Sequence, residues 1–106
     1  MSDSDIIRAL AEKCMGWKLW DAYPDTWLTG EENNPSRKFW NPLSSISDAF
    51  MVVGAILARN KYFRLELQPS GKAAVSIWRN GKITTVRDDD QCRAICLAAI
   101  AALEER

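Results

Sequence analysis

The segment 61–87, KYFRLELQPSGKAAVSIWRNGKITTVR, decides the fold of this chain. Its apolar residues recur at every second position on either side of the Pro-Ser-Gly triplet, which is the period of a strand with one buried face. The alternating residues are Phe63, Leu65 and Leu67, followed by Ala73, Val75 and Ile77. Asn80-Gly81 is typical of a type I′ turn because both residues tolerate a positive φ. We therefore predict an antiparallel three-stranded meander over about residues 61–87.

The two turns of this meander also predict its register. A two-residue loop at Asn80-Gly81 places Trp78 opposite Ile83, Ile77 opposite Thr84 and Val75 opposite Val86. A three-residue loop at Pro69-Ser70-Gly71 places Leu67 opposite Ala73, Leu65 opposite Val75 and Phe63 opposite Ile77. All the apolar residues then share one face, whereas a loop of two or four residues would scatter them. This agreement favours the three-residue loop.

The opposite face of the predicted meander carries an unusual row of side chains. The register places Tyr62, Trp78 and Ile83 side by side across the strands, with Arg64 and Ser76 in the next row. A fully solvated face is not expected to carry such a row. Two interpretations remain open: the first helix or the segment 17–40 covers the row as a second layer, or the row is a surface for a partner or ligand. We expect intramolecular cover.

Three further segments have the helical period, at about residues 4–15, 45–59 and 89–104. Residues able to cap their N-termini are Asp3 or Ser4, Ser44 or Ser45, and Asp88. Asp48 follows Ser45 by three residues and Gln91 follows Asp88 by three, so both sites resemble a capping box. Gly16 is placed to end the first helix. In the second helix the apolar stripe is Ile46, Ala49, Phe50, Val53, Ile56 and Leu57.

The chain between the first two helices, residues 17–42, loses this regularity. It contains four of the chain's tryptophans, a short strand candidate in "WKLW", and turn residues such as Pro24 and Gly30. The predicted order is helix, Trp-rich segment, helix, meander, helix. This order indicates an α+β fold in a single domain over residues 1–106.

Composition excludes several functions. Lys plus Arg and Asp plus Glu both number 14 in 106 residues, so no global basic field favours nucleic acid, and nucleic-acid binding is not expected. No apolar run is long enough to span a membrane, and "MSDSDIIRAL" does not read as a signal sequence, so we expect a cytoplasmic protein. The three cysteines are expected to be reduced.

Three segments resemble one family: "CMGWKLWDAYPDTWL" at 14–28, "FWNPLSSISDAFMVV" at 39–53 and "QCRAICLAAIAALEE" at 91–105. Together they resemble the phage ABA sandwich domain, found in small bacteriophage and prophage proteins. The resemblance implies a three-layer α/β/α arrangement, with helices on both faces of the sheet. It also implies a phage gene product that works in the cytoplasm of an infected bacterium. It implies no reaction and no catalytic residues.

The residues themselves favour no catalytic or metal site. The chain has no histidine, the commonest general base and metal ligand. Cys92 and Cys96 lie one helical turn apart within an apolar stripe, which indicates core thiols. The run 88–90 of three aspartates is explained by capping. We therefore expect no enzyme activity, no metal and no cofactor.

Two groups of residues remain as candidates for binding. Arg37 and Lys38 stand beside Phe39 and Trp40, a mixture of cations and aromatics found in nucleotide binders. The other interpretation, which we favour, is a loop whose aromatics anchor it to the core while its charges face water. The candidate binding residues are Arg37, Lys38, Trp40, Tyr62, Arg64 and Trp78. We expect a non-enzymatic phage accessory protein that binds a host or phage protein. Inhibition of a host defence protein is one such role. The alternative is a small-molecule or nucleotide sequestering protein. The exposed edge of the meander also suggests a weak homodimer.

Overall fold

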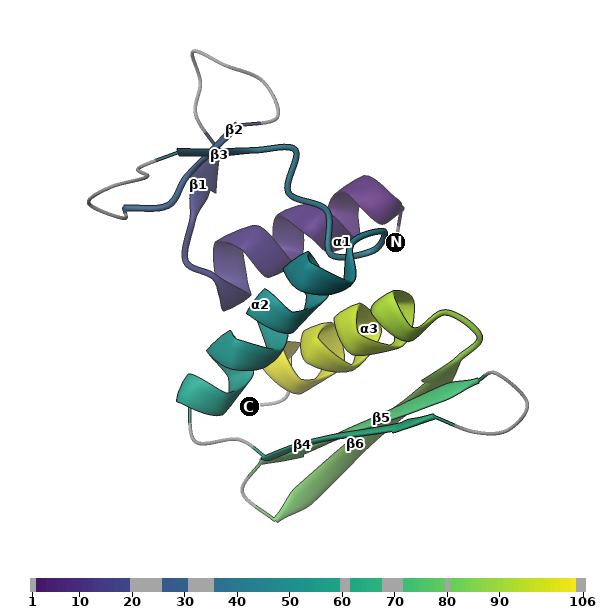
Figure 1. Ribbon diagram of the computed structural model, residues 1–106. Coiled ribbons are helices and arrows are strands. Elements are labelled where there is room, and N and C mark those ends of the chain that lie inside the picture. Colours follow the sequence, from purple (N-terminus) through teal and green to yellow (C-terminus); the bar gives the residue numbers. More distant parts are fainter. Residues whose placement is uncertain are drawn as a thin grey trace.

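The computed structural model describes residues 2–19, 26–30, 36–59, 62–67, 72–79 and 81–104. The fold is α+β, as predicted, with two antiparallel three-stranded sheets and the helices between them (Figure 1). In chain order the elements are α1 Asp3–Ala9, the π-helical turn η1 Leu10–Cys14, β1 Lys18–Leu19, β2 Thr26–Leu28, β3 Ser36–Lys38, α2 Ile46–Ala58, β4 Tyr62–Leu67, β5 Ala73–Arg79, β6 Lys82–Asp88 and α3 Gln91–Glu104.

The meander is formed by β4, β5 and β6 in that order, with the predicted register. The pairs Tyr62 with Trp78, Leu65 with Val75 and Leu67 with Ala73 are confirmed. So are Trp78 with Ile83 and Val75 with Val86. Gly81 has φ +81°, in agreement with the predicted tight turn. The predicted loop Pro69-Ser70-Gly71 lies outside the described residues, and only its consequence, the register, is observed.

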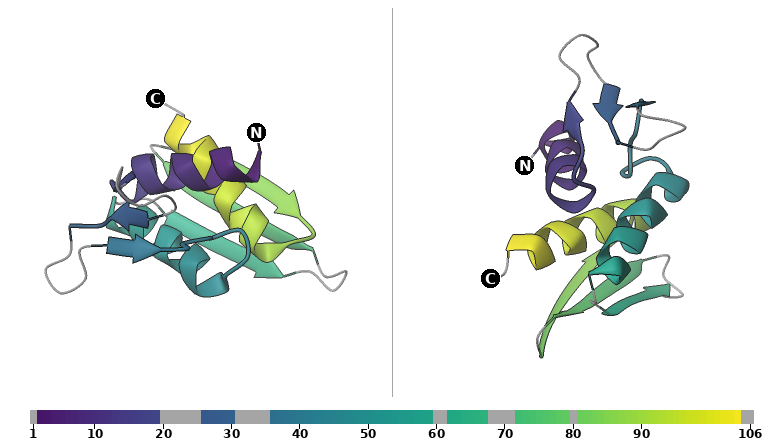
Figure 2. Two further views of the ribbon diagram at one scale, coloured as in Figure 1. Left: turned by 90° about the horizontal axis from the view of Figure 1, so that it is seen from above. Right: turned by 90° about the vertical axis from the view of Figure 1, so that its left-hand side faces the viewer.

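All three helices lie on one side of this meander, as the views in Figure 2 agree. α3 packs on β5 and β6, α2 packs on β4, and α1 with η1 packs on the other two helices. The α/β/α layering that the resemblance implied, with helices on both faces, is therefore wrong for the described chain. The physical reason is that Ile6 and Leu10 of the first helix are completely buried against the helical layer, so this helix is not available to cover the outer face.

The ends of the helices differ in detail from the predictions. The first helix is capped by Ser2, in a capping box closed by Asp5, and not by Asp3 or Ser4. α3 is capped by Asp90, whose Oδ1 accepts from the backbone N–H groups of Cys92 and Arg93. The predicted cap Asp88 instead accepts from the N–H of Asp90. Capping residues compete locally, so neighbouring aspartates cannot be distinguished by spacing alone.

The first helix ends as predicted at Gly16, which has φ +74°. Its last turn, η1, is a π-helical turn in which Met15 N–H donates to the carbonyl of Leu10 at 2.9 Å. The Arg59 guanidinium, one residue after α2, donates to the carbonyls of Lys13 and Cys14 at 2.9 Å each. A cation therefore satisfies the unpaired carbonyls at this helix end and ties it to α2.

The buried face of α2 is rotated from the predicted stripe. Ala49, Val53 and Ile56 are buried as predicted, but Val52 joins them, and Ile46, Phe50 and Leu57 are exposed. The prediction is wrong for these last three because apolar residues surround most of this helix, and its periodicity does not distinguish one face from another. An exposed apolar stripe on α2 is the result.

The Trp-rich segment forms the second sheet, in the order β1-β2-β3. The strand predicted from "WKLW" is present as β1, and β2 and β3 were not predicted. Trp17, Trp27 and Trp40 belong to the same hydrophobic core as the helices. In the described part of the chain, no helix is long and apolar enough to cross a membrane.

Candidate functional site

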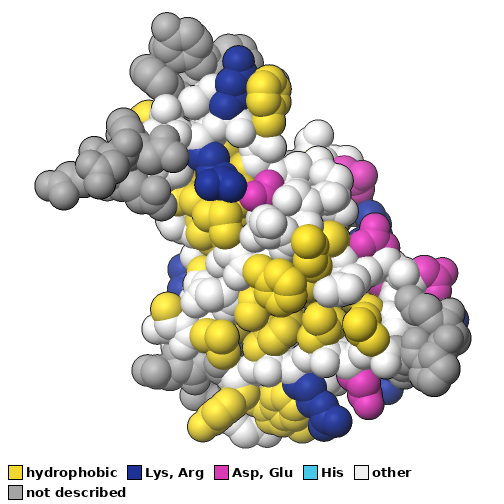
Figure 3. All heavy atoms as spheres, viewed as in Figure 1, with side chains coloured by type: hydrophobic (Ala, Val, Ile, Leu, Met, Phe, Trp, Pro, Cys, Tyr) yellow, Lys and Arg dark blue, Asp and Glu magenta, His cyan; other side chains and the backbone are white. Residues whose placement is uncertain are grey.

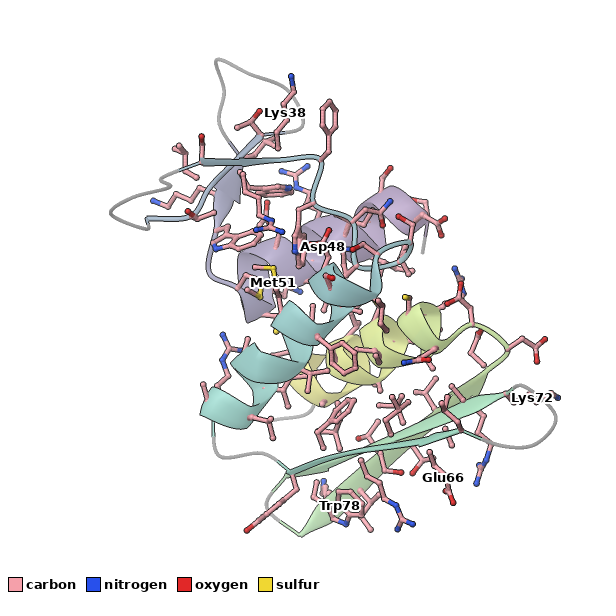
Figure 4. The ribbon with its side chains drawn as sticks, in the orientation of Figure 1. Lys38, Asp48, Met51, Glu66, Lys72 and Trp78 are labelled. Carbon is pink, nitrogen blue, oxygen red and sulfur yellow. The ribbon has the colours of Figure 1, made fainter. Side chains whose placement is uncertain are left out.

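Asp48 in the first turn of α2 organises one of the two candidate regions. Its Oδ1 accepts from Arg37 Nη2 at 2.9 Å, and its Oδ2 accepts from the backbone N–H of Asn41 at 3.0 Å. Only 7 % of Asp48 is exposed. Ser45 caps α2 by accepting from Asp48 N–H, as predicted, but the Asp48 carboxylate faces the chain that leads out of β3 (Figure 4). This carboxylate thus fastens residues 37–41 to the helix.

Two of the candidate binding residues in this region have structural partners. Arg37 is held by Asp48, and Trp40 is buried, with its ring centroid 4.9 Å from that of Trp17 in an edge-to-face arrangement. Trp40 is therefore not an exposed stacking platform, and it anchors this segment to the core, in agreement with the favoured interpretation of the sequence. Its Nε1 is buried and has no hydrogen-bond partner among the described residues. Lys38 is exposed, as expected of a binding residue.

Phe39 has an unusual backbone conformation between these residues. Its φ is +58°, in the left-handed region of the backbone that residues other than glycine and asparagine rarely adopt. The ring is 71 % exposed, and Lys38 Nζ lies 4.9 Å from its centroid. A bulky aromatic residue held in this conformation and exposed to solvent is a feature that often marks a binding site.

Phe39 stands at the wall of a cavity of about 420 Å³ between α1, the small sheet and the segment before α2. Its walls include Ile7, Arg8, Leu19, Trp27, Phe39 and Trp40. The cavity is thus mainly apolar and aromatic, with one guanidinium group. Its size is in the range of small-molecule sites. Arg8 is also bonded through Nε to Glu12 at 2.9 Å.

The outer face of the meander forms the second candidate region. Tyr62, Trp78 and Ile83 form the predicted row, and Tyr62 is 75 % exposed and Ile83 59 %. Beside Tyr62 and Trp78, Arg64 contributes to a shallow hollow of about 440 Å³. In the next row the hydroxyls of Ser76 and Thr85 are 3.0 Å apart, so these polar groups satisfy each other.

The expected cover of this row is not found. The first helix and the described residues of segment 17–40 lie on the far side of the helical layer (Figure 1). The row is therefore largely open to solvent in the described structure, with Trp78 half-buried between two exposed neighbours. The candidate residues also separate into two regions, because Lys38 and Trp78 lie at opposite ends of the molecule (Figure 4).

The thiols of α3 have an environment that opposes reactivity. Burial, with smaller contributions from Cys92 and Asp90, raises the pKa of Cys96 to about 12. Burial and then the Asp90 carboxylate also raise the pKa of Cys92. A raised pKa leaves little thiolate, the nucleophilic form, near neutral pH. Within the described ranges, no group of three Cys, Asp or Glu residues is arranged to hold a metal ion.

Sequence reasoning missed several members of the first region. Arg8 was not selected because an exposed arginine on a helix carries no signal by itself. Asp48 was assigned to capping because its spacing from Ser45 fits a capping box. The conformation of Phe39 had no signal, since the residue lacks the usual preference for a left-handed backbone.

Comparison with known proteins identifies a family and a similar solved structure. A family model described as the phage ABA sandwich domain matches residues 8–100. A phage protein from Bacillus cereus ATCC 14579, known from a 2.0 Å crystal structure, is similar in fold with a TM-score of 0.74. Its sequence is 20% identical, and the match covers 96% of this chain and 92% of that one. No curated protein matches the chain.

Proposed function

The chain belongs to the phage ABA sandwich domain family, and from this premise we propose that it acts by binding a protein partner in the cytoplasm of the infected host. It performs this role without catalysing a reaction. The observation that carries the proposal is the row Tyr62, Trp78 and Ile83 on the outer face of the meander, in which Tyr62 and Ile83 are exposed and Trp78 is half-buried. The proposal covers two kinds of protein partner. One is a host protein, including a component of host defence, and the other is another phage protein.

The composition of the outer face favours a protein partner. Tyrosine, tryptophan and arginine are the residues that most often dominate the binding energy of protein interfaces, and Tyr62, Trp78 and Arg64 meet in one hollow. The surface is built on paired strands, so its side chains are positioned before binding. Equal numbers of basic and acidic residues argue against nucleic acid, whose binding depends on neutralising phosphates.

The absence of catalysis is part of the proposal and has its own support. Enzymes usually contain a group whose pKa is adjusted toward the operating pH. The shifts of Cys92 and Cys96 go the other way, because burial moves these thiols further from ionisation at neutral pH. The chain also contains no histidine.

The test is retention of partners on the immobilised chain from lysates of infected and uninfected host cells. The variant Tyr62→Ala/Trp78→Ala removes most of the row, and Lys38→Ala, at the opposite end of the molecule, is the control. We expect a protein identified by mass spectrometry that wild type and the control both retain and the double variant loses. Circular dichroism confirms that each variant is folded. Equal retention by the double variant would sink the proposal.

A second candidate function follows from the cavity beside Trp27, Trp40 and Arg8. Its aromatic walls and single guanidinium fit a planar small molecule that carries negative charge, such as a nucleotide. The buried Nε1 of Trp40 offers a hydrogen-bond donor that lacks a partner in the described residues. The chain would then act by sequestering this ligand.

Thermal unfolding with a panel of nucleotides at millimolar concentration separates this function from the first. We expect at least one nucleotide to raise the melting temperature of wild type and of Arg87→Gln, a control on β6. The same nucleotide should not stabilise Arg8→Gln. If no nucleotide stabilises the wild type, sequestration of nucleotides is excluded.

A further inference from the structure

The strand β4 has an open edge that is suited to pairing. It is the first strand of the order β4-β5-β6, and no strand among the described residues pairs with its other side. The six residues Tyr62–Leu67 include no proline and no glycine, and all six are paired with β5 without a bulge. An edge of this kind presents a row of unpaired N–H and C=O groups, which is a template for another strand.

From this edge we propose that two copies of the chain pair antiparallel through β4 about a twofold axis at Leu65. The two meanders then form one continuous six-stranded sheet. An axis perpendicular to the sheet keeps outer residues on the outer face. The axis must therefore pass through a residue, and moving it by one residue along β4 shifts the opposing strand by two. The sequence of β4 can therefore be tested against each allowed register.

Charge selects one register of this set. Centring the axis on residue 64 places Arg64 opposite Arg64 of the second copy, and centring it on residue 66 places Glu66 opposite Glu66. Like charges directly opposite each other are destabilising. Centring it on Leu65 places Arg64 opposite Glu66 of the second copy, and this pair occurs twice. Both side chains are exposed and lie on the outer face, with Arg64 Nη2 4.0 Å from Glu66 Oε1 within one chain.

The inner side of the same edge adds apolar complementarity. In this register Phe63 faces Leu67 of the second copy, and Leu65 faces its own counterpart. Leu67 is largely exposed in the single chain, while Phe63 and Leu65 are half-buried. The pairing thus removes from water an edge that the single chain leaves open.

The exposed stripe of α2 lies on the same side of the molecule as β4. Ile46, Phe50 and Leu57 are about half exposed, and hydrophobic side chains gather over α2 on the face shown in Figure 3. The right-hand view of Figure 2 places α2 and β4 on the same side. Pairing of the two β4 strands therefore brings the two α2 helices together, as helices that cover a continuous sheet pack at about 8–10 Å.

Gly54 in the middle of α2 gives independent support. Glycine within a helix is unfavourable relative to alanine, and its position must normally be explained by a turn or a close approach. The φ of Gly54 is not positive, and a Cβ there would meet nothing within 4 Å in the single chain. The single chain therefore has no need of glycine here. A second helix that packs closely against the exposed stripe would require a residue without a side chain at this position.

Sedimentation velocity at concentrations up to about 1 mM tests the dimer by charge exchange. Arg64→Glu and Glu66→Arg each place like charges opposite each other, and we expect each to weaken self-association at least tenfold. A mixture of these two variants restores both pairs of opposite charges and should form a heterodimer. Arg87→Glu, the same charge change on the other edge strand β6, is the control and should dimerise as wild type does.

Gly54→Gln provides a second variant that tests helix packing and not strand pairing. Glutamine favours a helix more than glycine, so the variant should unfold at higher urea concentration than wild type in dilute solution. It should nevertheless dimerise at least tenfold more weakly. Monomeric wild type at the highest concentration overturns the proposal. Failure of the mixed charge variants to associate, or an equal loss in Arg87→Glu, also overturns it.

Discussion

Replacing Asp48 by alanine tests the contact that holds the segment 37–41 against α2. The substitution removes the ion pair with Arg37 and the acceptor for Asn41 N–H. Because the Arg37 side chain is 38% exposed, the ion pair is screened and contributes about 0.5–1 kcal/mol. The bond from a backbone N–H to a carboxylate adds about 1.5–3 kcal/mol. We expect Asp48→Ala to lower the free energy of unfolding by about 2–4 kcal/mol.

Urea unfolding followed by tryptophan fluorescence measures this loss, since Trp40 lies beside the contact. Asp48→Asn keeps an oxygen for Asn41 N–H and should lose only about 1 kcal/mol, because it removes the charge and not the acceptor. Asp89→Ala removes an exposed carboxylate near α3 and should stay within about 0.5 kcal/mol of wild type.

The difference in the free energy of unfolding between these variants shows whether the Asp48 carboxylate holds the segment 37–41, and whether its charge or its acceptor oxygen does so. If Asp48→Ala costs no more than Asp89→Ala, the carboxylate does not fasten the segment, and the cavity beside Phe39 is held by other contacts. If Asp48→Asn costs as much as Asp48→Ala, the charge dominates and the backbone acceptor contributes little.

Three further outcomes are expected. In native protein at pH 7 iodoacetamide should label Cys92 slowly and Cys14 and Cys96 hardly at all; rapid labelling of Cys96 even at pH 10 would contradict its pKa of about 12, which leaves roughly 1% thiolate there. Gly81→Ala should lower the free energy of unfolding by about 1–2 kcal/mol, measured by urea unfolding, because φ is +81° at this turn; no change would contradict the turn. Trp40→Phe should cost less than about 1.5 kcal/mol by the same measurement, because the lost volume is offset by removal of an unpaired buried N–H; a loss of 3 kcal/mol or more would indicate that the indole N–H has a partner.

The meander could be predicted residue by residue because its determinants are local. The alternation around Leu65 and Val75 defines one face, and the turn at Gly81 limits the register to one solution. These signals depend on neighbours within the same hairpin, so the register follows from them without information on tertiary packing.

The exposed stripe of α2 could not be predicted in the same way. Phe50 and Val52 are both apolar, and the helix pattern gives no reason for one to be buried and the other exposed. The choice depends on where β4 and α3 approach the helix, which is long-range information. The same limit applies to Asp48, whose carboxylate reaches Asn41 only because β3 passes beside α2.

The sequence predicted which candidate residues of the meander lie together, but not the surroundings of the candidate residues before α2. Tyr62, Arg64 and Trp78 come together as the register required. Arg37 and Trp40 were selected for their chemistry, but chemistry alone does not show whether a cation or an indole is occupied by structural partners. Burial of Trp40 and the contact of Arg37 with Asp48 give both residues a structural role, and Trp40 also lines the cavity beside Phe39.

The two faces of the meander give the two proposals different geometric requirements. Dimerisation uses the edge of β4, the Arg64–Glu66 pairs on the outer face next to that edge and the inner side, where α2 lies, while partner binding uses the row Tyr62, Trp78 and Ile83 on β4, β5 and β6. A twofold axis perpendicular to the sheet carries outer face onto outer face, so both rows in a dimer look in one direction. A shallow hollow binds weakly by itself, but two that engage one target gain affinity through effective concentration. Dimerisation through β4 would therefore strengthen the outer row without burying it.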